Sequence, residues 1–92
     1  MVTAKNWTVD IVVDEHPETR TTRAEARLHT GDPTHVRGIG RSWRNPQDPE
    51  VPEIGDELAV SRALSDLAGR LRSAADDDIE DVAPPEEASH GW

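Results

Sequence analysis

The sequence lacks cysteine, phenylalanine and tyrosine altogether, and its only aromatic residues are three tryptophans. Without cysteine there is no disulfide scaffold, zinc–thiolate centre or thiol enzyme. Long apolar runs are also missing, since none is longer than the three residues at 11–13, and we expect no membrane-spanning segment. The first residues lack the basic and apolar stretches of a secretion signal, so we expect a cytoplasmic protein.

Apolar side chains are scarce and acidic ones abundant, which is a composition typical of disordered chains. The formal net charge of the 92 residues is −9. The apolar residues nevertheless recur with regular periods between residues 6 and 82, as they do in folded segments. We therefore predict one ordered domain over residues 6–82, with a flexible N-terminus at 1–5 and a flexible acidic tail at 83–92. A core this thin favours a homodimer.

Three segments alternate between apolar and polar side chains and are predicted to be strands, at residues 6–14, 20–29 and 35–43. The first of them has apolar side chains on one face, so we expect a half-buried strand with Trp7 in the core. The second contains alanine and glutamate, which favour helices, but its strict period of two favours a strand.

The second and third strands predict a hairpin register. If Leu28 faces Val36, then Ala26 faces Gly38 and Ala24 faces Gly40. All of these residues are small or apolar and share one face. Glycine in the middle of a strand weakens the strand, so the two glycines indicate that a helix approaches this face closely.

A proline-rich loop at residues 45–52 precedes a predicted amphipathic helix of about five turns, beginning near Gly55 or Asp56. Its apolar stripe contains Val60, Leu64, Leu67 and Leu71. The aspartates at 76–78 predict the start of a short second helix. The expected fold class is α+β: a three-stranded antiparallel sheet with the order β-β-β-α-α and one long helix on one face.

The sequence NPQDPEVPEIGDELAVSRALSDL at residues 45–67 resembles a small actinobacterial family of stress- and dormancy-associated proteins, long described as a domain of unknown function. The resemblance includes WTVDIVVDEH at 7–16, TRAEARL at 22–28, the glycines at 38 and 40, and DIE at 78–80. Members of that family are similar in fold to double-stranded-RNA-binding domains and resemble ribosome hibernation-promoting factors. The resemblance implies a dimer that quiets translation during stress, without catalytic residues. This chain departs from the family at residues 41–44, which are more basic here than in members of the family.

The predicted face away from the helix is the candidate partner-binding surface. Its members are Arg23, Arg27, Arg37, Ile39, Arg41 and Trp43. Three interpretations remain open: a solvated face compensated by nearby carboxylates, a contact surface for an acidic protein such as a second copy, and a phosphate-binding surface for ribosomal RNA. The net charge of −9 opposes the last of these, because it repels RNA at long range.

No residue pattern identifies a catalytic reaction, and we expect neither an enzyme nor a small-molecule substrate. His29 and His35 flank a turn that contains Asp32, which is a conceivable metal-binding set, but solvated histidines are the simpler interpretation. No metal and no cofactor is therefore predicted. Two functions remain: a stress protein acting on the ribosome, or a dimeric protein-interaction module without nucleic-acid contact.

Overall fold

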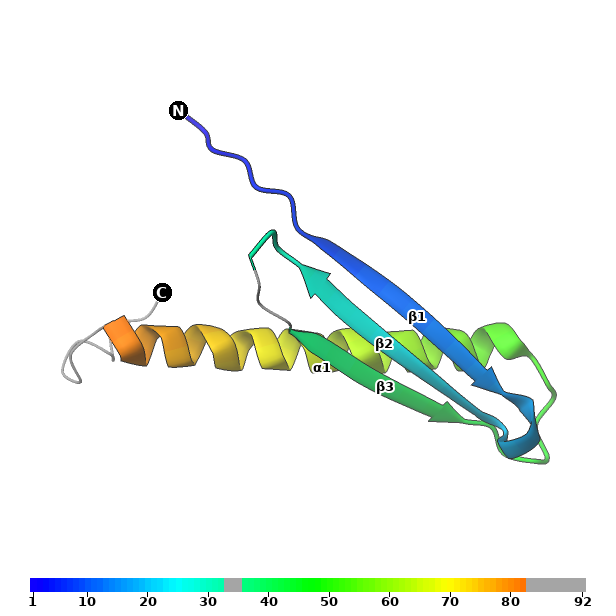
Figure 1. The fold of residues 1–92 in the computed structure, drawn as a ribbon. Helices are drawn as coiled ribbons and strands as arrows, with labels where there is room; N and C mark the ends of the chain where they lie inside the picture. Colours follow the sequence, from blue (N-terminus) through cyan, green and yellow to red (C-terminus); the bar gives the residue numbers. More distant parts are fainter. Residues whose placement is uncertain (33–35, 83–92) are drawn as a thin grey trace.

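The computed structural model describes residues 1–32 and 36–82. Strands β1 (Thr8–His16), β2 (Thr21–His29) and β3 (Arg37–Trp43) precede the helix α1 (Pro52–Val82), and a short 3-10 turn, η1 (Pro17–Thr19), joins β1 to β2. The sheet has the order β1-β2-β3 and α1 crosses one of its faces (Figure 1). The predicted α+β class, with a three-stranded antiparallel sheet and a long helix, is confirmed. His35, His90 and the predicted tail lie outside the described residues.

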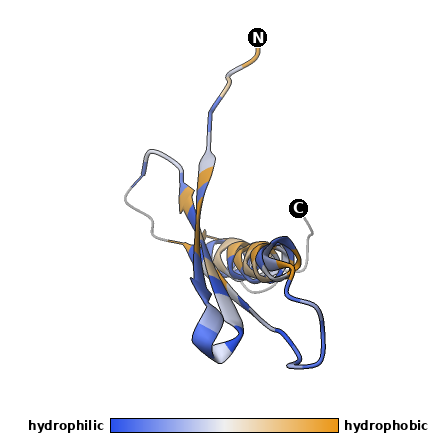
Figure 2. Cartoon of the chain, turned by 90° about the vertical axis from the view of Figure 1, so that its right-hand side faces the viewer, coloured by the Kyte–Doolittle hydropathy of each residue, from blue (hydrophilic) through white to orange (hydrophobic). Residues whose placement is uncertain are grey.

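The predicted hairpin register is also confirmed. Ala26 is opposite Gly38 and Ala24 is opposite Gly40, while Leu28 donates its backbone N–H to the carbonyl oxygen of Val36 over 3.0 Å. Alternate residues of an antiparallel pair point to the same side, so these small side chains form one continuous face. Helix α1 lies on that face (Figure 2).

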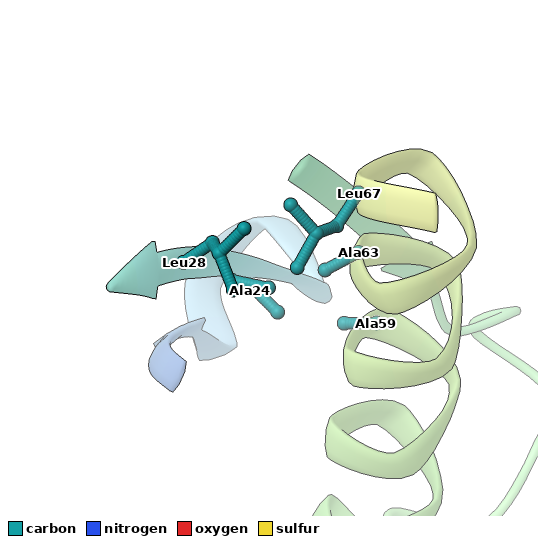
Figure 3. Packing of buried hydrophobic residues seen from close by; sticks show 6 residues of the cluster. Ala24, Leu28, Ala59, Ala63 and Leu67 are labelled. Atoms are coloured by element: carbon teal, nitrogen blue, oxygen red, sulfur yellow. The ribbon is translucent and has the colours of Figure 1, made fainter. Parts of the chain in front are cut away.

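The two glycines of β3 set how closely α1 approaches the sheet. A Cβ atom at Gly38 would overlap the carbonyl oxygen of Ala63, and one at Gly40 would overlap that of Ala59. Figure 3 shows the helix side of this contact, where Ala59, Ala63 and Leu67 point toward β2. The helix backbone therefore rests almost directly on the strand backbone.

This close approach corrects the predicted helix stripe. The buried helix residues are Ala59, Ala63 and Leu67, whereas Leu64 remains exposed and Val60 is only partly buried. A helix that touches glycine backbone can place only small side chains at the contact, and the larger ones are displaced to its flank. The periodicity identified the correct side of the helix, and Leu67 of the predicted stripe is buried, but Leu64 lies outside the contact and Ala59 takes part in it.

The helix boundaries differ from the prediction at both ends. Helix α1 begins at Pro52, because the fixed φ of proline suits the first helical turn. It continues without a break through the aspartates at 76–78, so the predicted second helix does not exist. A capping residue starts a new helix only where the preceding helix ends. No glycine or proline that would end α1 lies between Arg70 and Val82.

Strand β1 is exposed on both faces, and its predicted half-burial is wrong. Trp7 precedes the strand and is 56% exposed, so its predicted place in the core is also wrong. A helix is about 10 Å wide and strands lie about 4.8 Å apart, so one helix covers two strands. Helix α1 packs on β2 and β3 and barely touches β1.

Candidate functional site

The six residues of the predicted partner-binding surface lie on one face of the sheet, opposite α1; we call them the arginine surface. Arg27 is opposite Arg37, and Arg23 is opposite Arg41. Like charges in such positions repel each other. The arrangement therefore requires a compensating negative charge between them.

Glu25 supplies that charge from the middle of the arginine surface. Its carboxylate accepts a hydrogen bond from Arg27 Nε at 2.8 Å and one from Arg37 Nη1 at 3.3 Å, and it lies 3.6 Å from Arg23 Nη1. The hydrogen bond from Arg27, followed by the nearby positive charges, lowers the pKa of Glu25 below its usual value. Glu25 is only 5% exposed, so the three guanidinium groups enclose it.

The apolar members of the arginine surface are separated. Ile39 lies beside Glu25 in the register and is partly buried, whereas Trp43 is at the end of β3 and is 58% exposed. Val12 lies on the other side of Glu25, on β1. The structure thus brings Arg23, Arg27 and Arg37 together around Glu25, beside Ile39, and leaves Trp43 at the rim.

The free edge of β3 is occupied by side chains of α1. Asp66 Oδ2 accepts the backbone N–H of Ile39 at 2.9 Å, and Arg62 Nη1 donates to the carbonyl oxygen of Arg41 at 2.8 Å. The hydrogen bond from Ile39, and then that from Arg70, lower the pKa of Asp66. These contacts satisfy backbone groups that would otherwise be available for pairing with another strand.

Strand β1 forms the other edge of the sheet, and within the described residues it pairs only with β2. Val9, Ile11 and Val13 point to the same side as α1, because they are opposite Leu28, Ala26 and Ala24; these three β1 residues are the β1 strip. Ile11 is 41% exposed, and its neighbours in the strip are similarly accessible. The alternation of these residues predicted a buried face, so this exposed surface could not be recognised from the sequence.

The helix flank next to β1 is also apolar. Arg62 and Asp66 reach the β3 edge, and successive helix residues turn by about 100°. Val60 and Leu64 therefore lie on the opposite flank of the docked row, toward β1. The helix side of the sheet therefore carries exposed apolar side chains both on β1 and on this flank of α1.

A cavity of about 360 Å³ lies where the sheet ends near the start of α1; we call it the terminal cavity. Its walls come from the end of β1, from η1, from the end of β3 and from residues 48–58. Its large apolar side chains include Trp43, Val51, Ile54 and Leu58. A hydrogen bond to Asp56, and then the charge of that residue, raise the pKa of Glu15 at the cavity wall.

The histidines do not form a metal site in the described part of the chain. His29 Nε2 lies 2.8 Å from Asp10 Oδ2 across the β1–β2 pair, rather than beside Asp32. Among residues 1–32 and 36–82, no group of three or more histidine, aspartate or glutamate side chains is placed to hold a metal ion. In the same residues, no helix combines the length and the apolar character needed to cross a membrane.

Comparison with known proteins places the chain among mycobacterial relatives. It is 51% identical over 78 residues to the uncharacterized protein Mb1767 of Mycobacterium bovis, covering 85% of this chain and 80% of that protein. It is 45% identical over 76 residues to the uncharacterized protein Rv2632c of Mycobacterium tuberculosis, covering 83% and 78% respectively.

The fold has a crystallographic counterpart. The crystal structure of Rv2632c superposes with a TM-score of 0.75 at 37% sequence identity, covering 99% of this chain and 98% of that one. The Rv2632c-like family pattern matches residues 5–88, which include every described strand and helix. The chain therefore belongs to the Rv2632c-like family.

Proposed function

We propose that the protein is a non-enzymatic protein-interaction module that acts as a homodimer, joined through the free edge of β1. The observation that carries this proposal is the exposed β1 strip on an unpaired edge strand. A long edge strand with apolar side chains readily pairs with another strand, and proteins usually block such edges. Asp66 and Arg62 block the β3 edge, whereas no described residue pairs with the outer edge of β1.

A second copy of the chain fits this edge in one register. Two β1 strands related by a two-fold axis run antiparallel, and their helices then lie on the same side of a six-stranded sheet. If Ile11 faces its own copy, Val9 faces Val13 and Asp10 faces Val12. Three apolar pairs then meet on the helix side, and no two carboxylates are directly opposite.

The neighbouring registers are less favourable. A register centred on Val12 places Asp10 opposite Asp14, and one centred on Asp10 places that residue opposite itself. Like charges directly across a ladder are destabilising. The positions of the two aspartates therefore select the register centred on Ile11.

Salt dependence separates this function from RNA binding. Each copy has a net charge of −9, so two copies repel each other at long range, and added salt screens that repulsion. Dimerisation is therefore expected to strengthen as salt increases. Binding to phosphates shows the opposite trend, because it depends on counterion release.

The test is the molar mass in solution measured by light scattering. The protein should give twice its chain mass of 10.1 kDa, and Ile11→Asp should give the single-chain mass. Val82→Asp introduces the same charge at another exposed apolar position, on the last turn of α1, and should remain dimeric. A single-chain mass for the unaltered protein at about 100 µM, or a dimeric Ile11→Asp, would contradict the proposal.

A stress- or dormancy-associated role on the ribosome is the second candidate function. The observation that favours it is the arginine surface, which stays accessible when β1 strands pair because it lies on the face opposite α1. Its positive charge is largely directed at Glu25, which weakens the case for phosphate binding. Sedimentation with ribosomes across a salt series tests this role: retention that falls with salt and with Arg41→Ala would support it, and absence from ribosomal fractions at low salt would exclude it.

A further inference from the structure

Residues 1–7 form an extended arm, and no described strand pairs with it. The last pair of the β1–β2 ladder is Thr8 with His29, so the arm continues past the end of β2 (Figure 1). Val2 and Trp7 are both largely exposed on it. An exposed tryptophan on an extended segment is the kind of side chain that anchors one protein on another.

The terminal cavity has the complementary properties. Its walls are mainly apolar, yet Trp43, Ile54 and Leu58 remain substantially exposed in the isolated chain. Its charged lining residues are of both signs: Glu15, Asp48, Glu50, Arg20 and Arg44. An apolar cavity of this kind suits an aromatic side chain from a binding partner.

The β1 register brings the arm and the cavity together. When Ile11 faces its own copy, extending the same ladder places Trp7 opposite Glu15 and Asn6 opposite His16. Glu15 and His16 form the β1 wall of the cavity. Both Trp7 and Glu15 continue the alternation that faces α1, so the indole would enter on the cavity side of the sheet.

We propose that the terminal cavity of each copy receives the N-terminal arm of the second copy, with Trp7 as its anchor. This inference rests on the proposed dimer and adds a second contact to it. In the same register Lys5 would come opposite Pro17, next to the acidic Glu18, which favours its positive charge. The arm thereby extends the ladder beyond β1 and covers apolar walls that the single chain leaves open.

Engineered cysteines test the arm separately from the dimer, because the chain has no cysteine of its own. Opposite residues of an antiparallel pair have Cα atoms about 4.5–5.5 Å apart, which suits a disulfide. Ile11→Cys should therefore cross-link two copies. A mixture of Asn6→Cys and His16→Cys copies should also cross-link under oxidation. Asn6→Cys alone should not, because its two sites would lie about 30 Å apart.

The outcomes distinguish the two proposals. Cross-linking through Ile11→Cys without cross-linking between Asn6→Cys and His16→Cys would overturn the arm contact and leave the dimer. Failure of both would overturn the dimer itself. Trp7→Ala should raise the dimer dissociation constant at least about tenfold, whereas Val2→Ala on the same arm should not change it. An unchanged dissociation constant for Trp7→Ala would show that Trp7 is not the anchor.

Discussion

Replacing Gly40 with alanine is a direct test of how α1 docks on the sheet. The added Cβ would overlap the carbonyl oxygen of Ala59 and the backbone nitrogen of Ala63. Neither group is the end of a flexible side chain, so the whole helix must shift away from β3. Forcing extra methylene volume into a tightly packed contact costs about 1–3 kcal/mol, and we expect the upper part of that range because both overlaps involve backbone.

The effect is large compared with the total stability. A domain of this size is stable by about 4–10 kcal/mol at roughly 0.05–0.15 kcal/mol per residue. Gly40→Ala should therefore lower the urea midpoint clearly, and Gly38→Ala should do the same through its contact with Ala63 and Leu67. The free energy of unfolding should be compared at one chain concentration, since association contributes to apparent stability.

Gly69→Ala is the matched control for this experiment. Apart from the adjoining helix backbone, no atom of the described residues lies within 4 Å of the position of its added Cβ, and the site is on the exposed side of α1. Alanine favours a helix over glycine by about 0.8–1.0 kcal/mol, so this variant should be more stable than the original. If Gly40→Ala changed the free energy of unfolding by less than about 0.5 kcal/mol, the close-contact argument would be refuted.

Three further predictions concern the carboxylates. Glu25→Gln should lower the free energy of unfolding near neutral pH and make that free energy fall less in acid. The pKa of Glu25 is lowered in the folded protein, so the carboxylate stabilises the fold above its usual pKa of 4.5, and this stabilisation is lost as the pH falls through the lowered pKa. Urea titrations from pH 3 to pH 7 check this. Glu15→Gln should raise the free energy of unfolding only above about pH 4.5. The pKa of Glu15 is raised in the folded protein, so the original protein loses stability as the pH rises from 4.5 through that raised pKa. Thermal unfolding should therefore show a difference between the two proteins at pH 7 and none at pH 4. Asp66→Ala removes the acceptor of the Ile39 N–H, so exchange of that amide hydrogen should become about tenfold faster or more, and an unchanged rate would disprove the edge contact.

The sequence alone determined the strands, the hairpin register and the side of the sheet on which α1 lies. Alternation of period two fixes which side chains share a face, and the pairing of Ala24 and Ala26 with Gly40 and Gly38 leaves only that face open to a helix. The same alternation predicted that the residues of the arginine surface share the opposite face of the sheet. The sequence also predicted that nearby carboxylates compensate this surface, and the structure shows that Glu25 does so through contacts with Arg23, Arg27 and Arg37.

Only the tertiary structure decided how far that helix reaches. Alternation gives β1 an apolar face, but it cannot state that a helix about 10 Å wide covers β2 and β3 and stops short of a third strand. The same geometry put Trp7 outside the core and exposed the β1 strip. It also placed Ala59 rather than Val60 at the contact, because the distance between two backbones is set by the glycines of a strand far away in the sequence. Local sequence patterns therefore determined which side chains share a face. The width of α1 and its distance from the sheet determined which of those faces are buried.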